Sequence, residues 1–196
     1  VLGAEHPDTL MSVNNMGVLL LDMGQYEEAE KYTKRALEAE ERVLGAEHYG
    51  TLISVNNMGM LLWEMGNNEE AEKYYKRALE AQERVLGSEH PNTLTSVNNL
   101  GVLFSGMGNY EEAEKYTKRA LEVKERLLGA KHPETLKSVG NMGVLLQEMG
   151  QYEEAEKYYK RSLEAKERLL GAEHPDTLTS VSNMGVLLQE MGQYEE

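Results

Sequence analysis

One 42-residue segment recurs along this chain, four times in full and a fifth time in part. The copies begin at Val1, Val43, Val85, Leu127 and Leu169. A fixed period between about 20 and 50 residues is typical of a solenoid, because a single unit buries its apolar face only by stacking on its neighbours. We therefore expect one repeat array over residues 1–196, with repeats at 1–42, 43–84, 85–126 and 127–168 and a partial repeat at 169–196.

The chain begins and ends inside the repeat. Val1-Leu2-Gly3 closes a helix in the other copies, and Tyr194-Glu195-Glu196 opens one. These ends favour a segment of a longer array.

Composition favours a soluble cytoplasmic protein. The chain has no cysteine, so neither a disulfide framework nor a thiolate metal site is expected, and an oxidising compartment is not indicated. The net charge of −14 disfavours nucleic acid and anionic membrane surfaces, since their binders cluster Lys and Arg. No apolar run approaches the roughly 18 residues that a membrane span requires.

Two antiparallel helices are predicted in each copy. In the first copy, one helix begins after His6-Pro7-Asp8 and runs to Met23, because proline is favoured at the first helical position and leaves His6 as the N-cap. The second runs from about Tyr26 to Leu44. Gly24 and Gly45 end the two helices. Apolar or small residues recur at three- and four-residue steps in both, at Leu10, Val13, Met16, Gly17 and Leu20 and at Ala29, Tyr32, Ala36 and Leu37.

The second helix and the second repeat carry further signals. Acid-before-base pairs at i,i+4 predict ion pairs on an exposed face: Glu27 with Lys31, Glu30 with Lys34, and Glu38 with Arg42. The second repeat has His48-Tyr49-Gly50 in place of His-Pro and an acid or amide, which predicts a looser helix start there.

Three stretches resemble the tetratricopeptide repeat: Asn15-Met16-Gly17-Val18-Leu19-Leu20, Gly24-Gln25-Tyr26-Glu27-Glu28-Ala29 and Lys34-Arg35-Ala36-Leu37. Gly17, Ala29 and Ala36 fall on its small-residue positions. The usual repeat has about 34 residues, and the 42-residue form is similar to the repeats of kinesin light chains. The resemblance covers the whole chain. It implies an all-α, right-handed superhelical solenoid of antiparallel helix pairs, whose first helices line a concave groove.

An asparagine recurs in the middle of every first helix, where asparagine is a poor helix former. The row consists of Asn15, Asn57, Asn99, Asn141 and Asn183. Two interpretations are open. The amides hydrogen-bond between adjacent first helices, or they hold the backbone of a bound peptide, as asparagines in this part of the first helix do in peptide-binding tetratricopeptide proteins. A second asparagine precedes the first three, at Asn14, Asn56 and Asn98, but Gly140 and Ser182 replace it later.

The copies differ most at two rows of the first helix. One row is Met11, Ile53, Thr95, Lys137 and Thr179, and the other is Leu21, Trp63, Ser105, Gln147 and Gln189. Groove specificity would produce this variation, and so would drift at exposed positions. The first two repeats are apolar along these rows and beside them, at Met11, Val18, Leu21, Ile53, Met60 and Trp63. They would anchor an apolar side chain of a ligand, or else pack against neighbouring helices.

These patterns predict a protein-interaction scaffold and no enzyme. No nucleophile, base and orienting group stand in a catalytic pattern. The five histidines are equivalent and lie a repeat apart, so they suit helix caps, and we expect no metal or other cofactor. The groove rows contain one lysine, which favours a neutral or basic peptide with an apolar anchor. The alternative is a structural module or consensus-like array that self-associates head to tail, since near-identical copies let one chain's end imitate an interior interface.

Overall fold

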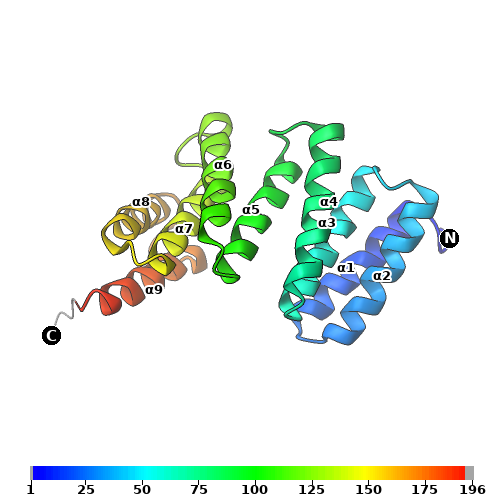
Figure 1. The fold of residues 1–196 in the computed structure, drawn as a ribbon, viewed down its shortest axis with the longest axis horizontal. Coiled ribbons are helices and arrows are strands. Elements are labelled where there is room, and N and C mark those ends of the chain that lie inside the picture. The colour runs from blue at the N-terminus through cyan, green and yellow to red at the C-terminus, as the bar shows by residue number, and fades with distance from the viewer. Residues whose placement is uncertain (1, 193–196) are drawn as a thin grey trace. The chain divides into compact units, whose positions relative to one another are not determined.

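The computed structural model of the chain describes residues 2–192 and is all-α over that range. It contains α1 (Pro7–Asp22), α2 (Tyr26–Val43), α3 (Tyr49–Glu64), α4 (Asn68–Leu86), α5 (Pro91–Gly106), α6 (Tyr110–Leu128), α7 (Pro133–Glu148), α8 (Tyr152–Leu170) and α9 (Pro175–Glu190) (Figure 1). Odd-numbered helices are the first helices of the repeats, and even-numbered helices are the second. The predicted fold class, a solenoid of helix pairs, is confirmed.

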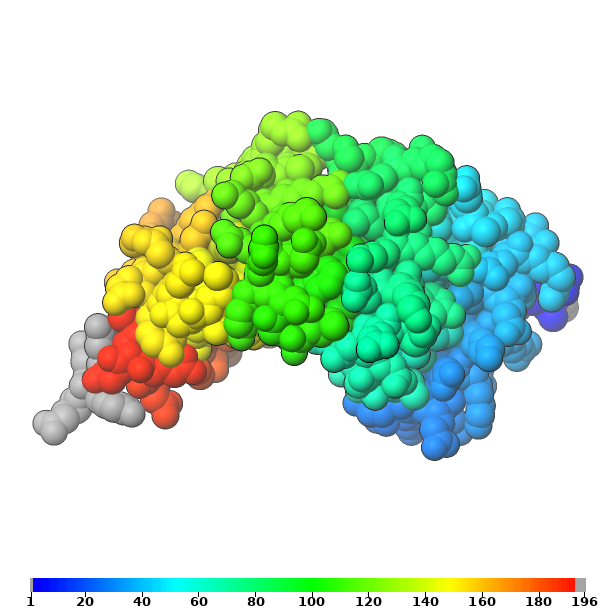
Figure 2. Space-filling model, viewed as in Figure 1, coloured from blue at the N-terminus to red at the C-terminus, as the bar shows by residue number. Residues whose placement is uncertain are grey.

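Two compact units divide the array, Val1–Leu103 and Phe104–Glu196. In the first unit α1 packs on α2, α2 on α3 and α3 on α4, and α1 also touches α3. In the second unit α6 packs on α7, α7 on α8 and α8 on α9, and α7 also touches α9. The red atoms of α9 lie directly against the yellow atoms of the helices before it (Figure 2). Each unit therefore stacks its helices in chain order, with successive first helices in contact.

Histidine caps begin the first helices, as predicted. The Nδ1 atom of each histidine accepts a hydrogen bond from the backbone N–H two residues later, at 3.1 to 3.2 Å, in His6, His48, His90, His132 and His174. Such a bond satisfies one of the amides that a helix start leaves unpaired. The looser start predicted for the second repeat is not observed. His48 caps α3, which begins at Tyr49 without proline.

Left-handed glycines end the helices. Gly24 has φ 72° and Gly45 has φ 95°, a backbone conformation that side-chain-bearing residues rarely adopt. The Gly24 and Gln25 amides donate back to the carbonyls of Leu21 and Leu20 at 2.8 and 2.9 Å. The turns predicted at these glycines are confirmed.

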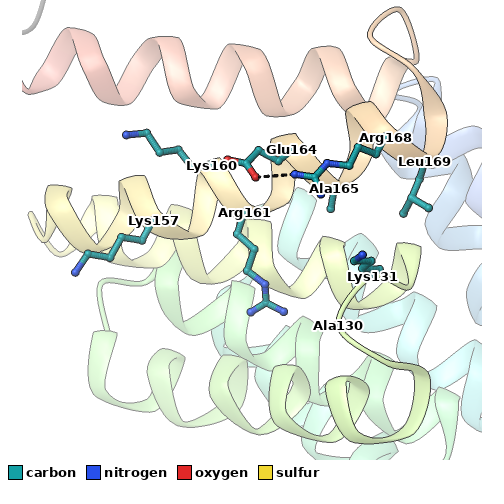
Figure 3. A pocket seen from close by; sticks show the side chains of 9 residues that line it. All are labelled: Ala130, Lys131, Lys157, Lys160, Arg161, Glu164, Ala165, Arg168 and Leu169. Carbon is teal, nitrogen blue, oxygen red and sulfur yellow. Dashed lines mark hydrogen bonds and ion pairs between the residues drawn. The ribbon is translucent and has the colours of Figure 1, made fainter.

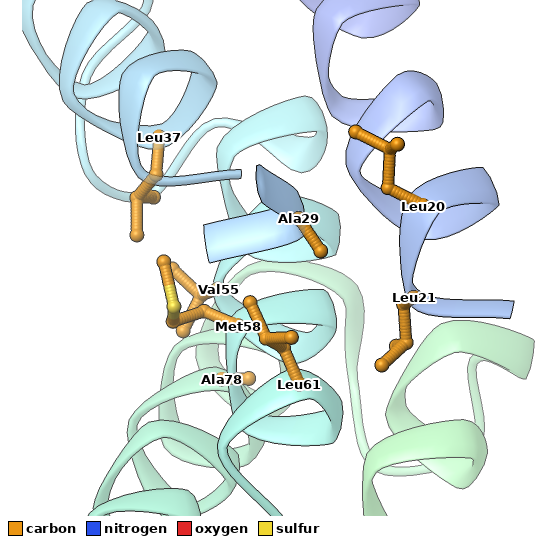
Figure 4. Packing of buried hydrophobic residues seen from close by; sticks show 8 residues of the cluster. All are labelled: Leu20, Leu21, Ala29, Leu37, Val55, Met58, Leu61 and Ala78. Carbon is orange, nitrogen blue, oxygen red and sulfur yellow. The ribbon is translucent and has the colours of Figure 1, made fainter. Parts of the chain in front are cut away.

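The core of the first unit is shared among repeats. Residues of α1 to α4 form one buried cluster: Leu20, Leu21, Ala29, Leu37, Val55, Met58, Leu61 and Ala78 (Figure 4). Burying one such leucine stabilises by about 2 kcal/mol relative to leaving it exposed. No repeat in this cluster completes its core alone, which is the physical reason for the array.

Within a repeat, the two helices approach closely where the first carries glycine. A Cβ added at Gly59 would lie 2.8 Å from the Tyr75 ring, and one added at Gly143 would lie 2.6 Å from the Tyr159 ring. Both tyrosines are almost completely buried. These glycines occupy the small-residue position predicted at Gly17.

Candidate interaction surfaces

The predicted asparagine row lies on first-helix surface that stays partly accessible. Asn15 is exposed, and Asn57, Asn99, Asn141 and Asn183 are half-buried. The preceding row is deeper. Asn14 is buried, and Asn56 Oδ1 in α3 accepts a hydrogen bond from Ser96 Oγ in α5 at 3.2 Å. A bond between adjacent first helices is therefore made by Asn56, one residue before Asn57.

The predicted apolar anchor residues differ in accessibility. Met11 is 55% exposed, and Val18, Ile53, Met60 and Trp63 are half-buried. Leu21 is only 8% exposed because it belongs to the core cluster of the first unit, against which Met60 also packs. Leu21 and Met60 meet in a hollow of about 320 Å³ that Asp22, Gly24, Tyr26 and Glu64 complete. The other four predicted anchors do not line this hollow.

A larger hollow of about 580 Å³ lies on α8 and the loop before α7 in the second unit (Figure 3). Its lining is Ala130, Lys131, Lys157, Lys160, Arg161, Glu164, Ala165, Arg168 and Leu169. Sequence reasoning missed it. The available signal was Lys131, which stands where the other four copies have glutamate.

Lys131 changes the local ion pairing. In the first two repeats that glutamate pairs with the arginine at the end of the second helix: Arg42 with Glu5 at 2.6 Å, and Arg84 with Glu47 at 2.5 Å. In the fourth repeat Arg168 instead pairs with Glu164 at 3.1 Å, the contact dashed in Figure 3. Lys157, Lys160 and Arg161 also have acidic partners, Glu154, Glu156 and Glu125. The lining is therefore largely charge-compensated and is a weak candidate for an anion site.

The i,i+4 pairing predicted from the first copy is found at equivalent positions of the second and fourth copies. The i,i+4 pairs occur as Glu72 with Lys76 and Glu156 with Lys160, and as Glu164 with Arg168. Arg42 instead pairs with Glu5, and Lys73 pairs at i,i+3 with Glu70 at 2.5 Å. Long side chains in water exchange such partners at little cost, so spacing alone does not select between them.

A polar side chain lies at each junction between repeats. It comes from the second helix and faces the next first helix, and we call this set the junction residues: Glu40, Gln82, Lys124 and Lys166. The first three are buried and Lys166 is half-buried. Sequence reasoning missed this set. The available signal was a row that changes from acid to amide to base.

A serine of the next first helix is a recurrent partner of the junction residues. Ser96 Oγ donates to Gln82 Oε1 at 2.7 Å, and Lys166 Nζ donates to Ser180 Oγ at 2.9 Å. Burial raises the pKa of the Glu40 carboxyl, against a smaller lowering effect of the nearby Ser54. Burial likewise lowers the pKa of Lys124 and of Lys166, against the opposing effects of Glu134 and Asp176.

This architecture, a stack of helix pairs with a shared core and polar junctions, defines an α-solenoid of the kind that serves as a protein-interaction scaffold. The sequence profile of the tetratricopeptide repeat family matches residues 8–64, 52–126, 98–167 and 134–196. The chain belongs to the tetratricopeptide repeat family.

Solved structures agree with this assignment. The nearly identical tetratricopeptide-like repeats of a proposed kinesin light chain from Podosopora anserina are 25% identical, with a TM-score of 0.79 over 96% of this chain and 89% of that one. BtubC (BKLC) from P. vanneervenii is 21% identical, with a TM-score of 0.79 over 95% of this chain and 74% of that one, and shows the same fold. The resemblance to kinesin light chain repeats is confirmed. A comparison with curated proteins found no match.

Every helix in residues 2–192 is too short or too polar to cross a bilayer.

Proposed function

We propose that the chain binds a peptide or helix of a partner protein in a groove lined by its first helices. The observation that supports this proposal is the contact between α1 and α3, each of which carries accessible amide and apolar side chains. Asn15 and Asn57 supply the amides, and Met11, Ile53 and Trp63 supply the apolar surface. Amides suit the repeating polar groups of a backbone, and apolar residues suit one anchoring side chain.

The favoured ligand is neutral or basic with an apolar anchor. Helices α1 and α3 contain no lysine or arginine, whereas Asp22 and Glu64 line the hollow beside Leu21 and Met60. Acidic ligands would therefore meet like charge in the first unit, and basic ones would meet opposite charge.

Peptides selected from a random display library against the full chain provide the test, with Trp63 fluorescence as the readout. Since Trp63 is the only tryptophan, a groove ligand should change its emission. The Asn57→Ala variant should bind about tenfold more weakly, because a hydrogen bond to the ligand backbone is lost. Asn67→Ala is the matched control, since Asn67 is exposed and makes no side-chain cap bond at the start of α4. Selected peptides that leave Trp63 emission unchanged and bind both variants equally would contradict the proposal.

Self-association is a second candidate function, favoured by apolar side chains exposed on α1 and α9. They include Met16 and Leu19 on α1, Met23 directly after it, and Leu178, Val181 and Val186 on α9. Exposed apolar faces of this kind bind partners or copies. Light-scattering mass measured from micromolar to near-millimolar concentration should climb if copies stack end to end. A constant mass of one chain would reject this candidate and leave the groove.

The proposal includes a non-catalytic role and a cytoplasmic location. Tetratricopeptide arrays are scaffolds, and a chain without cysteine has no dependence on an oxidising compartment. Hydrolase activity measured with the full chain would contradict the non-catalytic role. A chain that folds only when it is secreted would contradict the cytoplasmic location.

A further inference from the structure

The hollow on α8 and the loop before α7, which we call the α8 hollow, differs in one charge from the equivalent place of the second repeat. Each charged residue of α8 that lines the hollow has an identical residue at the same place in α4. The exception lies in the loop, where Lys131 stands at the place of Glu47. The charge of this loop residue therefore distinguishes the two repeats here.

The loop backbone carries the lysine and the glutamate in the same way. Gly129 and Gly45 both have left-handed φ angles, 89° and 95°. The amides of His132 and His48 each donate to the carbonyl of that glycine at 3.2 Å. Exchanging lysine and glutamate between these two turns should therefore change the charge and leave the backbone as it is.

The glutamate of the second repeat closes an ion pair that the fourth repeat lacks. Arg84 at the end of α4 pairs with Glu47 at 2.5 Å. Lys131 repels the equivalent Arg168, which pairs instead with Glu164 of its own helix at 3.1 Å. Both side chains of this pair are more than 60% exposed, and such pairs exchange partners at little cost. Arg168 is thus available to a carboxylate placed beside Lys131.

Lys131 is the uncompensated charge of the α8 hollow. It makes no ion pair within residues 2–192, whereas Lys157, Lys160 and Arg161 each have an acidic partner. Those acids repel a free polyanion, so the hollow suits a single carboxylate that further contacts hold in place.

Apolar surface beside Lys131 supplies such a contact. Leu169 is 51% exposed and lines the α8 hollow with the half-buried Ala165. Val85 and Leu127, at equivalent places inside the array, are 48% and 47% exposed, so an open residue here is a property of the repeat. Figure 3 shows Lys131 at the same end of the hollow as Arg168 and Leu169.

The α8 hollow lies on a side of α8 that is completed by preceding parts of the same unit. Arg161 in its lining pairs with Glu125 of α6. Ala130 and Lys131 belong to the loop that follows α6. The hollow is therefore formed between neighbouring elements of the array.

We propose that the α8 hollow binds an acidic segment of a partner protein, whose carboxylate takes the place of the missing glutamate between Lys131 and Arg168. An apolar residue next to that acid covers Leu169 and Ala165. Arginine and lysine together hold a carboxylate by charge-assisted hydrogen bonds. The acid comes from a different protein, because copies of this chain, each with a net charge of −14, repel one another.

This inference goes beyond the proposed function and does not depend on it. The proposed groove lies on the first helices and favours a neutral or basic peptide, whereas the α8 hollow lies on a second helix and favours an acid. Trp63 belongs to the unit Val1–Leu103, and the hollow belongs to the unit Phe104–Glu196. A peptide bound in the hollow should therefore leave the emission of Trp63 unchanged.

Peptides from a random display library, selected on the parent chain and counter-selected on the Lys131→Glu chain, test the proposal. The variant restores the glutamate of the other four copies, so it should fold, and its new carboxylate should pair with Arg168. We expect the recovered peptides to share an acid next to an apolar residue. They should bind the variant about tenfold more weakly than the parent. Lys34→Glu on exposed α2 surface makes the same change in net charge and should leave binding unchanged.

The reverse substitution in the second repeat should create a second site. Glu47→Lys removes the partner of Arg84 and gives that repeat the same lining charges as the α8 hollow. Titration calorimetry should then show that a second peptide binds to each chain. Unchanged stoichiometry would overturn the proposal, and so would recovered peptides without an acid. Peptides that alter Trp63 emission and bind the Lys131→Glu chain as well as the parent would overturn it while supporting the groove. A dimer that Lys131→Glu abolishes without peptide would overturn the assignment to a different protein.

Discussion

Two glycines at equivalent places in their helices have opposite surroundings. Gly143 in α7 lies under the Tyr159 ring, whereas a Cβ at Gly185 in α9 would have no atom of residues 2–192 within 4 Å. Burial raises the pKa of Tyr159 to about 12, with smaller contributions from Glu148 and Glu190, and its hydroxyl donates to Gln147 Oε1 at 2.9 Å. The ring is thus fixed by packing and by a hydrogen bond, and it cannot move aside for a methyl group.

Alanine should therefore act differently at the two glycines. We expect Gly143→Ala to lower the free energy of unfolding by about 2 kcal/mol through overpacking. Gly185→Ala should raise it by up to about 1 kcal/mol, because alanine is the better helix former and the site is open. Urea denaturation followed by circular dichroism measures both. Equal effects at the two sites would mean that the contact with Tyr159 does not limit the size of this residue.

Glu40 makes stability depend on pH. Its side chain is 3% exposed, and within the described residues its Oε2 has no hydrogen-bond partner. Burial raises the folded-state pKa above the ordinary value of 4.5. The folded state therefore holds the proton more tightly than the unfolded chain. The associated stability is complete below about pH 4.5 and is lost as pH rises through the folded pKa.

The Glu40→Gln variant should remove this dependence. At pH 7 we expect its free energy of unfolding to exceed that of the parent by about 1 kcal/mol, because no carboxylate is left buried. Near pH 4 the difference should vanish. Gln82 already occupies the equivalent place at the next junction, hydrogen-bonded to Ser96, so the amide fits. Urea denaturation midpoints of the parent and the variant, measured at both pH values, test this prediction. The same stability difference at both pH values would show that Glu40 does not titrate in this range.

Sequence rules predicted the residues that act locally and missed those that depend on a neighbouring repeat. The histidine caps and the glycine turns were predicted because each is decided by its own few residues. Glu40 was not singled out, and Leu21 was left open between a ligand anchor and a residue that packs against neighbouring helices. Their burial depends on which helix packs over them, and helix periodicity does not specify the packing partner.

At the scale of helices, the junctions behave as matched pairs. Each second helix packs on the next first helix within its unit, at α2 with α3, α6 with α7, and α8 with α9. Most of the apolar contact is the same at every junction, because the copies are nearly identical. The junction residues, which change from acid to amide to base, are one of the differences between the junctions.

Reversing the charge of one junction residue should lower the free energy of unfolding, and a second substitution should restore part of the loss. We expect Lys124→Glu to lower the free energy of unfolding by about 3 kcal/mol, because it buries an acid opposite Glu134. Adding Glu134→Asn should recover about 1 kcal/mol, since the like charge is removed. Lys118→Glu on the exposed side of α6 serves as the control and should change little. Additive losses in the double variant, measured by urea denaturation, would show that the two residues are not coupled.

At the scale of the whole molecule, stability is distributed over two compact units. Repeat arrays gain stability from nearest-neighbour contacts, so a local defect weakens its own neighbourhood first. Trp63 belongs to the unit Val1–Leu103, and Gly143 belongs to the unit Phe104–Glu196. Tryptophan emission therefore reports on the unit Val1–Leu103, whereas total helix content reports on the helices of both units.

The Gly143→Ala variant should separate these two signals. We expect the circular dichroism transition to begin at lower urea concentration, while the Trp63 transition shifts less. In the parent chain the two transitions should lie closer together. Coincident curves in the variant would show that all the helices unfold as one cooperative unit.

The left-handed glycines of the described structure recur every 21 residues, from Gly24 to Gly192. Because of this regular spacing, recombination between copies in the gene can remove whole repeats from the protein without disturbing any turn. The polar side chains at the junctions restrict which of these deletions the fold can tolerate. Loss of residues 43–126 would keep the 21-residue spacing of the turns. It would nevertheless bring Glu40 opposite Glu134 and so place two acids at one junction. Deletion of whole repeats thus preserves the backbone turns but can bring incompatible side chains together. Only some in-frame deletions should therefore yield a folded array.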